Sequence, residues 1–571
     1  MEVTSNDRTR LTRKRLCRAK FLRYPSTLRA EAYPTFETPR LTRIRSGEAG
    51  PLPKQKAQNI LITLIASILS RFSGLATQFI TAWYLTPDEF GLYAIALGII
   101  TFTHLMRGGG TSIVYQSMKV DEYTRSGGGL FRFALIFGCL GALLTTGAAL
   151  PAQNYFNQPA LGKLLLWMAG LSLLTQVSTY PRAKMVSLLR FKQLASIDVV
   201  GAVVKLATAY ICASSGWGAL TFVVAQVAAL LLQFALSCIW AEFKRSDFVA
   251  QPDWMTHTFS LVKWPMAISV MISLMEQVDS FIASLFVPIG SLGVYFFAVQ
   301  IVAQPIRLIT QTLVGVLAPY GALVRGNRKL ESASLTTAFT AGLVFLPLCV
   351  LSIAAVYPSL ERLVWGAKWE ASIWPVMLTS IFLVYPTVQG VLEGPILGMR
   401  RWTTYLELIS WRAGGKIIGA FAAVFVIKWF ELTGPSIAIA LVIGVGAAGS
   451  ISGYIQIRKH LLATGSDREM VHYELWATPL YALLAVVATH GVMTSVMTHL
   501  SLDAYGVRIE ATVELVLSAM LYGAIAMTLL RFAYIENLKS VLFLVPLRWR
   551  VRICKVLVIH DHELTHNPLQ H

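Results

Sequence analysis

Charged residues are scarce in this sequence. Only 14% of its 571 residues are Asp, Glu, Lys or Arg, whereas a soluble globular domain has roughly 25%. Hydrophobic residues make up 55%, and the mean hydropathy is +0.59. A soluble core cannot absorb so much apolar sequence, so the composition excludes a soluble globular protein. It predicts an all-α polytopic membrane protein, because lipid tolerates no unpaired backbone polar group.

Motifs of soluble enzymes are also missing. The six cysteines are scattered without a Cys-x-x-Cys pair, which favours apolar filler over a zinc or redox centre. Four of the ten histidines cluster after residue 559, where a solvated polar tail is favoured over a metal site. No phosphate-binding loop occurs, because Gly415-Lys416 is followed by Ile417. The sequence therefore identifies no cofactor and excludes ATP hydrolysis by this chain, which leaves an H⁺ or Na⁺ gradient, or consumption of the product outside, as an energy source.

Hydrophobic stretches long enough to cross a bilayer recur along the chain. A window of about 20 residues, the length that crosses about 30 Å of hydrocarbon, finds about fourteen of them. They lie near 59–84, 91–117, 130–150, 161–180, 195–213, 218–240, 262–287, 293–320, 336–357, 372–398, 404–427, 434–457, 475–497 and 512–533.

Positive charge is distributed unevenly between the loops. Residues 1–56 carry 14 Lys or Arg against five acids, and alternate loops after them are basic, as at 182–192 and 400–401. The intervening loops, such as those near Pro87 and Pro288, carry few or no basic residues. By the positive-inside rule, this alternation predicts that both termini are cytoplasmic. The external loops are short, which argues against an external catalytic domain and hence against an enzyme.

The basic segment 1–56 has two interpretations. One is binding to anionic lipid or nucleic acid. The other is a disordered, orientation-setting cytoplasmic extension, or residues upstream of the true start codon. The segment has no apolar region typical of a cleaved secretory signal, and its low hydrophobicity favours the second interpretation. No nucleic-acid partner is therefore predicted.

One short phrase occurs twice. Residues 90–93 (FGLY) follow the first hydrophobic span, and residues 292–295 (LGVY) follow the seventh, with the glycines 202 positions apart. Internal repetition is typical of transporters, in which two related lobes rock around a site held between them. The phrase therefore predicts a duplicated membrane lobe.

Ionisable residues inside lipid-crossing helices are costly unless they are paired or hydrated, so each is a functional candidate. The ten in this chain are Arg71, Arg107, Lys205, Glu276, Asp279, Arg307, Glu393, Glu407, Arg412 and Lys416. Glu276 and Asp279 lie three positions apart on one helical face, which makes them candidates for coupling H⁺ or Na⁺. A structural alternative of equal weight pairs them with Arg71 or Arg307.

Five cations are candidates for binding an anionic substrate. Arg412 and Lys416 lie four positions apart on one face, where they would attract a phosphate or pyrophosphate. The alternative is that they snorkel towards the basic loop at 400–401. Arg71 lies in the middle of the first span, and Arg107 precedes three glycines that could open the second span to a cavity. Arg307 joins them because of its depth in the eighth span.

Several stretches of the sequence resemble one family, the bacterial Wzx-like oligosaccharide flippases of the polysaccharide transporter group within the MOP exporter superfamily. The stretches are 85–93 (LTPDEFGLY), 277–282 (QVDSFI), 292–295 (LGVY), 305–307 (PIR), 317–319 (LAP) and 398–401 (GMRR). The likeness extends over about residues 57–535.

The resemblance implies two six-helix lobes in a V-shaped, MOP/MATE-like arrangement around a central cavity, with two additional C-terminal helices. On this sequence, the expected division is a cytoplasmic tail at 1–56, an N-lobe at 57–242, a C-lobe at 243–460, the last two spans at 461–535 and a cytoplasmic tail at 536–571.

The function implied is translocation of an undecaprenyl-pyrophosphate-linked oligosaccharide repeat unit across the bacterial inner membrane, for exopolysaccharide, capsule or O-antigen (lipopolysaccharide) assembly. Membrane lipids and the polysaccharide polymerase and export machinery are the partners implied. The alternative on the same fold is an ion-coupled multidrug or cation exporter, an antiporter. Such an exporter should usually stop at about twelve spans and line its cavity with net acid, whereas this sequence has more spans and more cations.

Overall fold

The computed structural model describes residues 72–103, 110–116, 120–188, 190–243, 245–249, 252–463, 468–500 and 507–532. The chain divides into two units, Met1–Ala57 and Gln58–His571, and all described residues belong to the second. Apart from short connections, the described backbone is helical, which confirms the all-α prediction for this part of the chain. The basic segment 1–56 and the tail 536–571 lie outside the described residues.

Residues 72–84 are helical and form the end of the first predicted span. The later helices are α2 (Pro87–Thr103), α3 (Thr111–Gln116), α4 (Val120–Phe156), α5 (Pro159–Ser187), α6 (Phe191–Ser214), α7 (Leu220–Ala241), α8 (Trp254–Ser284), α9 (Ile289–Val324), α10 (Arg328–Trp365), α11 (Ile373–Phe382), α12 (Val384–Gly398), α13 (Trp402–Trp429), α14 (Pro435–Ala463), α15 (Arg468–Leu500) and α16 (Val507–Phe532), with short 3₁₀ helices η3 (Arg245–Phe248) and η4 (Glu370–Ser372).

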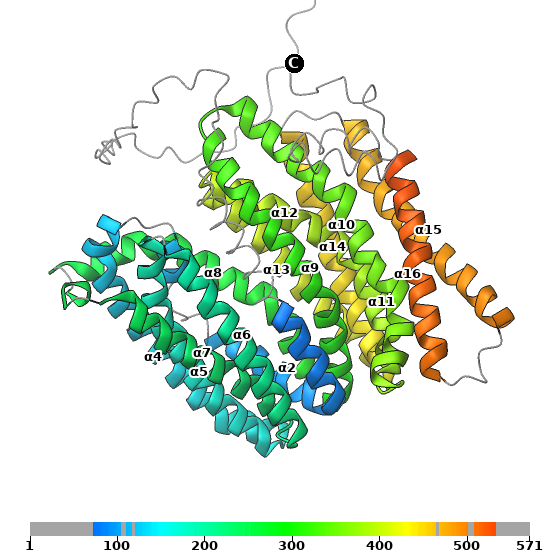
Figure 1. Ribbon diagram of the computed structural model, residues 1–571, viewed down its shortest axis with the longest axis horizontal. Coiled ribbons are helices and arrows are strands. Elements are labelled where there is room, and N and C mark those ends of the chain that lie inside the picture. Colours follow the sequence, from blue (N-terminus) through cyan, green and yellow to red (C-terminus); the bar gives the residue numbers. More distant parts are fainter. Residues whose placement is uncertain are drawn as a thin grey trace, which may run out of the picture. The chain divides into compact units, whose positions relative to one another are not determined.

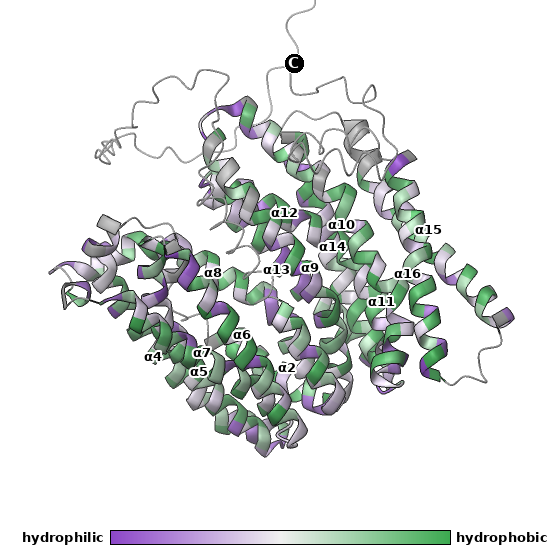
Figure 2. Cartoon of the chain, viewed as in Figure 1, coloured by the Kyte–Doolittle hydropathy of each residue, from purple (hydrophilic) through white to green (hydrophobic). Residues whose placement is uncertain are grey.

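Within the described residues, 11 helices are long and apolar enough to cross a membrane. A twelfth span results if η4 with α11 and then α12, which meet at a bend of 47°, form one broken span. Apolar residues dominate the lengths of the helices (Figure 2). The protein is therefore an all-α, multi-span membrane protein. The predicted count of about fourteen also includes span 59–84, which begins outside the described residues, and span 91–117, which is divided between α2 and α3.

The start of α2 shows how the local sequence defines a helix. The Glu89 carboxylate accepts a hydrogen bond from the Thr86 backbone N–H at 2.7 Å, and the Thr86 hydroxyl accepts one from the Glu89 N–H at 3.4 Å. This reciprocal pair is a capping box, and Pro87 at the first helical position has no N–H to satisfy. The LTPDEF segment is thus a strong helix start.

The helices form two groups that are continuous in sequence (Figure 1). The first helix group consists of residues 72–84 and α2–α7, and the second consists of α9–α14. Helix α8 contacts both. In its first half, Val262 lies in a buried cluster with Tyr115 and Tyr180 of the first group. In its second half, Val278 lies in a buried cluster with Ala420 of α13. Helix α8 therefore connects the groups through packing as well as through the chain.

The last two helices lie against α10 (Figure 1). The Tyr522 hydroxyl of α16 donates to the Leu348 carbonyl at 2.9 Å. The His490 ring of α15 is 3.2 Å from the Ala354 carbonyl oxygen. Helices α15 and α16 thus pack against the second helix group through α10.

The two copies of the repeated phrase meet where the helix groups touch. Gly293 of α9 lies directly against the backbone of Pro87 and Gly91 at the start of α2. One turn further along each helix, the rings of Tyr93 and Phe296 pack edge to face with centroids 5.9 Å apart. The phrase therefore marks the point at which the two repeats pack against each other.

The connection between α10 and α11 adds to this contact. Trp369 stacks on Phe297 with ring centroids 4.0 Å apart, and its indole N–H donates to the Ala82 carbonyl at 2.9 Å. The backbone N–H of Trp369 donates to the buried carboxylate of Glu361 at 2.8 Å, which fixes the tryptophan in place. We call the packing of Gly91, Tyr93, Gly293, Phe296, Phe297 and Trp369 the lobe contact.

Candidate functional site

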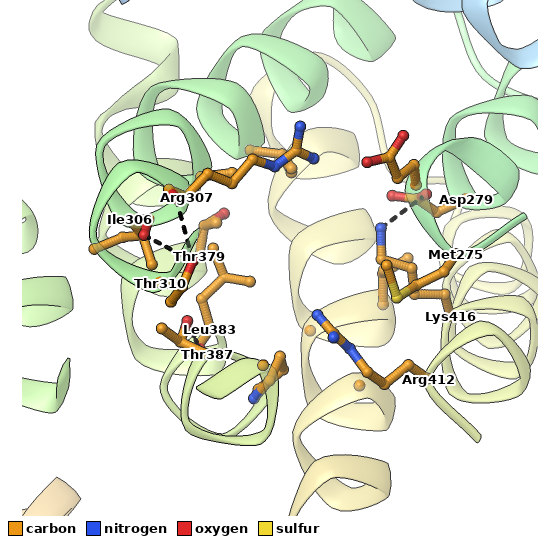
Figure 3. Close-up of a pocket in the computed structure, with 18 of the residues that line it drawn as sticks. Met275, Asp279, Ile306, Arg307, Thr310, Thr379, Leu383, Thr387, Arg412 and Lys416 are labelled. Atoms are coloured by element: carbon orange, nitrogen blue, oxygen red, sulfur yellow. Dashed lines mark hydrogen bonds and ion pairs between the residues drawn. The ribbon is translucent and has the colours of Figure 1, made fainter. Parts of the chain in front are cut away.

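A cavity of about 390 Å³ lies among α8, α9, α11, α12, α13 and α14 (Figure 3). All of its lining residues fall between positions 272 and 449. Its charged and polar lining includes Glu276, Asp279, Tyr295, Gln300, Arg307, Thr310, Gln311, Thr379, Thr387, Glu393, Tyr405, Arg412 and Lys416. The volume lies within the roughly 300–1,000 Å³ typical of small-molecule sites. Charged and polar side chains within an otherwise largely apolar lining suit a ligand that has both a charged and an apolar part.

Asp279 is the most deeply buried acid at this cavity. It is 2% exposed, and its Oδ1 lies 3.2 Å from the Nζ of Lys416 on α13. Its Oδ2 accepts a hydrogen bond of 2.5 Å from the hydroxyl of Tyr295 on α9. A buried carboxylate requires such partners because its desolvation would otherwise cost several kcal/mol. The three side chains connect α8, α9 and α13.

Glu393 forms a second pair at the same cavity. Its Oε1 lies 2.6 Å from the Nη1 of Arg412, and its Oε2 accepts from the Tyr405 hydroxyl at 3.3 Å. About a fifth of each charged side chain remains exposed. The two pairs follow the same scheme, in which one acid is held by one cation and one tyrosine.

Helix α13 supplies both cations. Because Arg412 and Lys416 are four positions apart, they lie on one face of the helix and point towards the cavity (Figure 3). Each side chain ends at a carboxylate, on α12 for Arg412 and on α8 for Lys416, rather than at the basic loop 400–401. Neither side chain therefore extends towards the loop, as the snorkelling interpretation would require.

Arg307 and Glu276 line the cavity in a different way. Neither forms an ion pair with another of the described residues, and Arg307 extends from α9 towards the space between α9 and α13 (Figure 3). Taken together, the lining holds three cations and three carboxylates. Among the described residues the lining is thus balanced in formal charge, and Arg307, the cation without an ion pair in this part of the chain, faces the cavity from the wall opposite α13.

The structure brings five of the seven predicted site residues to one cavity: Glu276, Asp279, Arg307, Arg412 and Lys416. Arg71 and Arg107 lie outside the described residues. Asp279 pairs with Lys416 and not with Arg307. The cavity lies among α8 and the second helix group, within residues 243–460 that were expected to form the C-lobe, and the central cavity between two lobes stays a prediction. Within this group, the ion pairs join α12 to α13 and α8 to α13.

Two residues of the site were not predicted from the sequence. Tyr295 and Tyr405 are uncharged, so a search for ionisable residues in spans could not select them. A signal for Tyr295 was present, since it closes the repeated phrase 16 positions after Asp279. For Tyr405 no pattern in the sequence pointed to Glu393, because their proximity depends on how α12 and α13 pack.

The comparisons with known proteins agree with this geometry. Residues 80–374 match the family described as Polysaccharide biosynthesis protein. The Succinoglycan biosynthesis transport protein ExoT of Rhizobium meliloti (strain 1021) is 23% identical over 362 residues, which are 60% of this chain and 72% of ExoT.

Among solved structures, the lipid II flippase MurJ in an inward closed conformation is similar over 83% of this chain and 99% of the MurJ chain, with a TM-score of 0.61 at 15% identity. A multidrug resistance MATE family transporter of the MOP superfamily, in an inward-facing conformation, matches 71% of this chain and 98% of its own with a TM-score of 0.49 and 14% identity.

A bundle of membrane-crossing helices around a charged cavity, with a fold similar to that of MurJ, is the class of structure that this chain forms. The chain belongs to the polysaccharide biosynthesis protein family. The resemblance to the Wzx-type flippases of the MOP superfamily is confirmed by this family match together with ExoT and the fold.

Proposed function

We propose that this transporter flips an undecaprenyl-pyrophosphate-linked oligosaccharide repeat unit across the bacterial inner membrane by alternating access. The observation that carries the proposal is the cavity in which three cations and three carboxylates are gathered among membrane-crossing helices. Ionisable groups at this depth mark substrate and ion pathways in membrane proteins. Because the relative ExoT is named for succinoglycan transport, an exopolysaccharide unit is the favoured cargo.

Arg307 has the clearest role in substrate binding. A guanidinium presents a planar fork of donors that matches two phosphate oxygens, and that of Arg307 is not engaged in any ion pair among the described residues. The cavity has the size of a drug-sized ligand, so it would hold the pyrophosphate and the nearest sugar rather than a whole oligosaccharide. The polyprenyl chain would remain in lipid.

In this proposal, Arg412 and Lys416 exchange their carboxylate partners for the phosphates of the substrate. Each is held by a carboxylate when no anionic ligand is bound. An entering pyrophosphate would compete with Glu393 and Asp279 for these cations, so binding would release two carboxylates. Arg71 and Arg107, by their depth in the sequence, are proposed as further cavity cations.

Asp279 and Glu276 are the proposed ion-coupling residues. A carboxylate released from its cation binds H⁺ or Na⁺ more readily, which links substrate capture to ion uptake. Glu276 lies one turn before Asp279 on α8 and lines the same cavity. Coupling would therefore occur on the face of α8 that also meets α13.

The proposed orientation follows from loop charge. The connections at 85–86 and 285–288, which adjoin the lobe contact, contain no Lys or Arg. The positive-inside rule then places the lobe contact on the external side and both termini in the cytoplasm. In this orientation, the lobe contact is the gate that must open to release the glycan outside.

A deletion strain tests the proposal. We expect single lipid-linked repeat units to accumulate on the cytoplasmic face, and the wild-type gene to restore export. The same strain should keep its resistance to cationic drugs. No accumulation of lipid-linked units, together with a change in drug resistance, would instead support the exporter on the same fold. Retained export in the deletion strain would contradict both functions.

A further inference from the structure

The second copy of the repeated phrase contributes residues both to the lobe contact and to the charged cavity. Gly293 packs against the first helix group at the lobe contact, while Tyr295, two positions later on α9, lines the charged cavity. Both residues belong to the first two turns of α9, which begins at Ile289. Any movement of this short segment must therefore change the lobe contact and the cavity together.

On the side of the lobe contact, the same segment packs against aromatic residues of the first group and of the α10–α11 connection. Phe296 packs edge to face on Tyr93, and Phe297 stacks on Trp369. Phe297 is fully buried. Buried aromatic pairs of this kind fix the position of a helix because their contacts are lost together when the helix shifts.

On the cavity side, the segment is held by one hydrogen bond. The Tyr295 hydroxyl donates to Asp279, and the other oxygen of that carboxylate holds Lys416. Hydrogen bonds to an ionised acceptor are about twice as strong as neutral ones. The hold on Tyr295 therefore depends on the charge of Asp279. The other ionisable groups at this cavity are Glu276 on α8, Arg307 on α9, Arg412 on α13, Glu393 on α12 and Tyr405 on α13.

The first copy of the phrase provides a contrast. Tyr93 occupies the position in α2 that Tyr295 occupies in α9, but its ring stacks on Phe222 with centroids 4.3 Å apart. No residue of the described chain accepts a hydrogen bond from its hydroxyl. Both copies of the phrase thus contain the tyrosine, and among the described residues the second copy alone has an acidic partner for it.

We propose that Tyr295 is a positioning residue that transmits the state of the Asp279–Lys416 pair to the lobe contact. When an anion draws Lys416 away, or when Asp279 is neutralised, the hydrogen bond from Tyr295 weakens and the start of α9 is released from α8. The aromatic packing around Phe297 then loosens and the lobe contact opens. The inference rests on the proposed alternating access, but it concerns the protein alone and not the identity of the cargo.

The test measures the width of the lobe contact in the purified full-length protein. Spin labels are attached at Trp217→Cys and Phe430→Cys, which are 49% and 68% exposed in the α6–α7 and α13–α14 connections. The six native cysteines are replaced by Ala. Distances between the labels are then compared for the otherwise unchanged protein and for Tyr295→Phe, Asp279→Asn and Tyr93→Phe, in nanodiscs without added glycan.

We expect Tyr295→Phe and Asp279→Asn each to increase the long-distance, open population about tenfold, the effect of losing one hydrogen bond to a charged group. The double variant should open no further than Tyr295→Phe alone, because Tyr295→Phe already removes the hydrogen bond that Asp279→Asn weakens. Tyr93→Phe, the matched hydroxyl deletion in the first repeat, should leave the distances unchanged.

An unchanged distance distribution in Tyr295→Phe would overturn the inference, as would an equal shift in Tyr93→Phe. If Tyr295→Phe fails to fold, the label distances in Asp279→Asn test the inference by themselves. A closed distance in Asp279→Asn would then overturn the inference. The two proposals fail separately. A strain that accumulates no lipid-linked units would refute the cargo while the label distances still respond, and rigid distances would refute the coupling while the cargo assignment stands.

Discussion

Gly293 of α9 lies so close to Gly91 of α2 that a Cβ on Gly293 would come within 2.9 Å of the Gly91 backbone nitrogen and would overlap the carbonyl oxygen of Pro87. The nearest atoms are backbone atoms, which cannot rotate away as a side chain would. The repeated phrase thus needs glycine at this point because two helix starts pass each other without room for a side chain.

Replacing Gly293 by Ala should therefore separate the helix groups at the lobe contact. Overpacking of this kind costs about 1–3 kcal/mol. We expect a lower melting temperature of the detergent-purified protein and reduced export in cells. Gly315→Ala is the control on the same helix, since a Cβ there would meet no atom within 4 Å. Because alanine has the higher helix propensity, Gly315→Ala should not lower the melting temperature, and an equally stable Gly293→Ala would show that the close approach does not determine the result.

The pair of Arg412 and Glu393 should contribute to stability as well as to transport. Arg412→Ala leaves the Glu393 carboxylate without its cation, and breaking a buried pair in this way costs roughly 3–5 kcal/mol. Because a fifth of each side chain is exposed, we expect a loss near the lower end of that range. Thermal unfolding measures it, and the double variant Arg412→Ala/Glu393→Ala should recover part of the loss.

The pair of Lys459 and Glu407 is the matched control. It also joins α13 to another helix through an ion pair, here α14 in place of α12, but its side chains are 56% and 37% exposed. Lys459→Ala should therefore change the free energy of unfolding by no more than about 1 kcal/mol. A larger loss there than at Arg412 would mean that burial does not govern these pairs.

Arg307 should affect transport without affecting stability. It lines the cavity but has no ion pair among the described residues, so its removal leaves no acid unpaired. We expect Arg307→Ala to lower repeat-unit export at least about tenfold, the value of a lost charge-assisted hydrogen bond, with an unchanged melting temperature. Arg307→Lys should be intermediate, because lysine keeps the charge and loses the fork.

Removal of the exposed Arg458 by Arg458→Ala controls for the loss of one positive charge and should leave export unchanged. If Arg307→Ala instead destabilised the protein as much as Arg412→Ala, the residue would have a structural role. Export is measured as the ratio of polymer outside the cell to lipid-linked units inside.

Trp369 should keep the lobe contact closed. The side chain is 1% exposed, and Trp369→Ala removes its stack on Phe297 and its hydrogen bond to Ala82. Trp→Ala substitutions in buried positions cost roughly 3–5 kcal/mol. We expect an Ala82→Cys thiol, buried in the parent protein, to react with a soluble maleimide at least about tenfold faster when Trp369 is replaced. Trp374→Ala, at a 63% exposed position, should leave this rate unchanged.

The sequence predicted the class of fold because its signals are local. Bilayer-length apolar runs, the capping residues Thr86 and Glu89, and the repeated FGLY and LGVY phrases each depend on neighbouring residues only. Predicted span 372–398 shows the limit. Its length and hydropathy describe one helix, but the structure bends it by 47° between Phe382 and Val384. Both α11 and α12 pack against α9, α10 and α14, and a hydropathy window contains no information about such packing.

What the sequence alone determined is which residues are expensive to bury: Glu276, Asp279, Arg307, Arg412 and Lys416 could be selected because a charge in lipid demands an explanation wherever it occurs. Only the tertiary structure decided how each charge is compensated. Asp279 and Lys416 are 137 positions apart, and Glu393 and Arg412 lie on different helices. The free energy of an ion pair depends on distance and burial, and both follow from helix packing. For the same reason, the structure alone showed that one copy of the repeated phrase connects the lobe contact to the charged cavity through Tyr295.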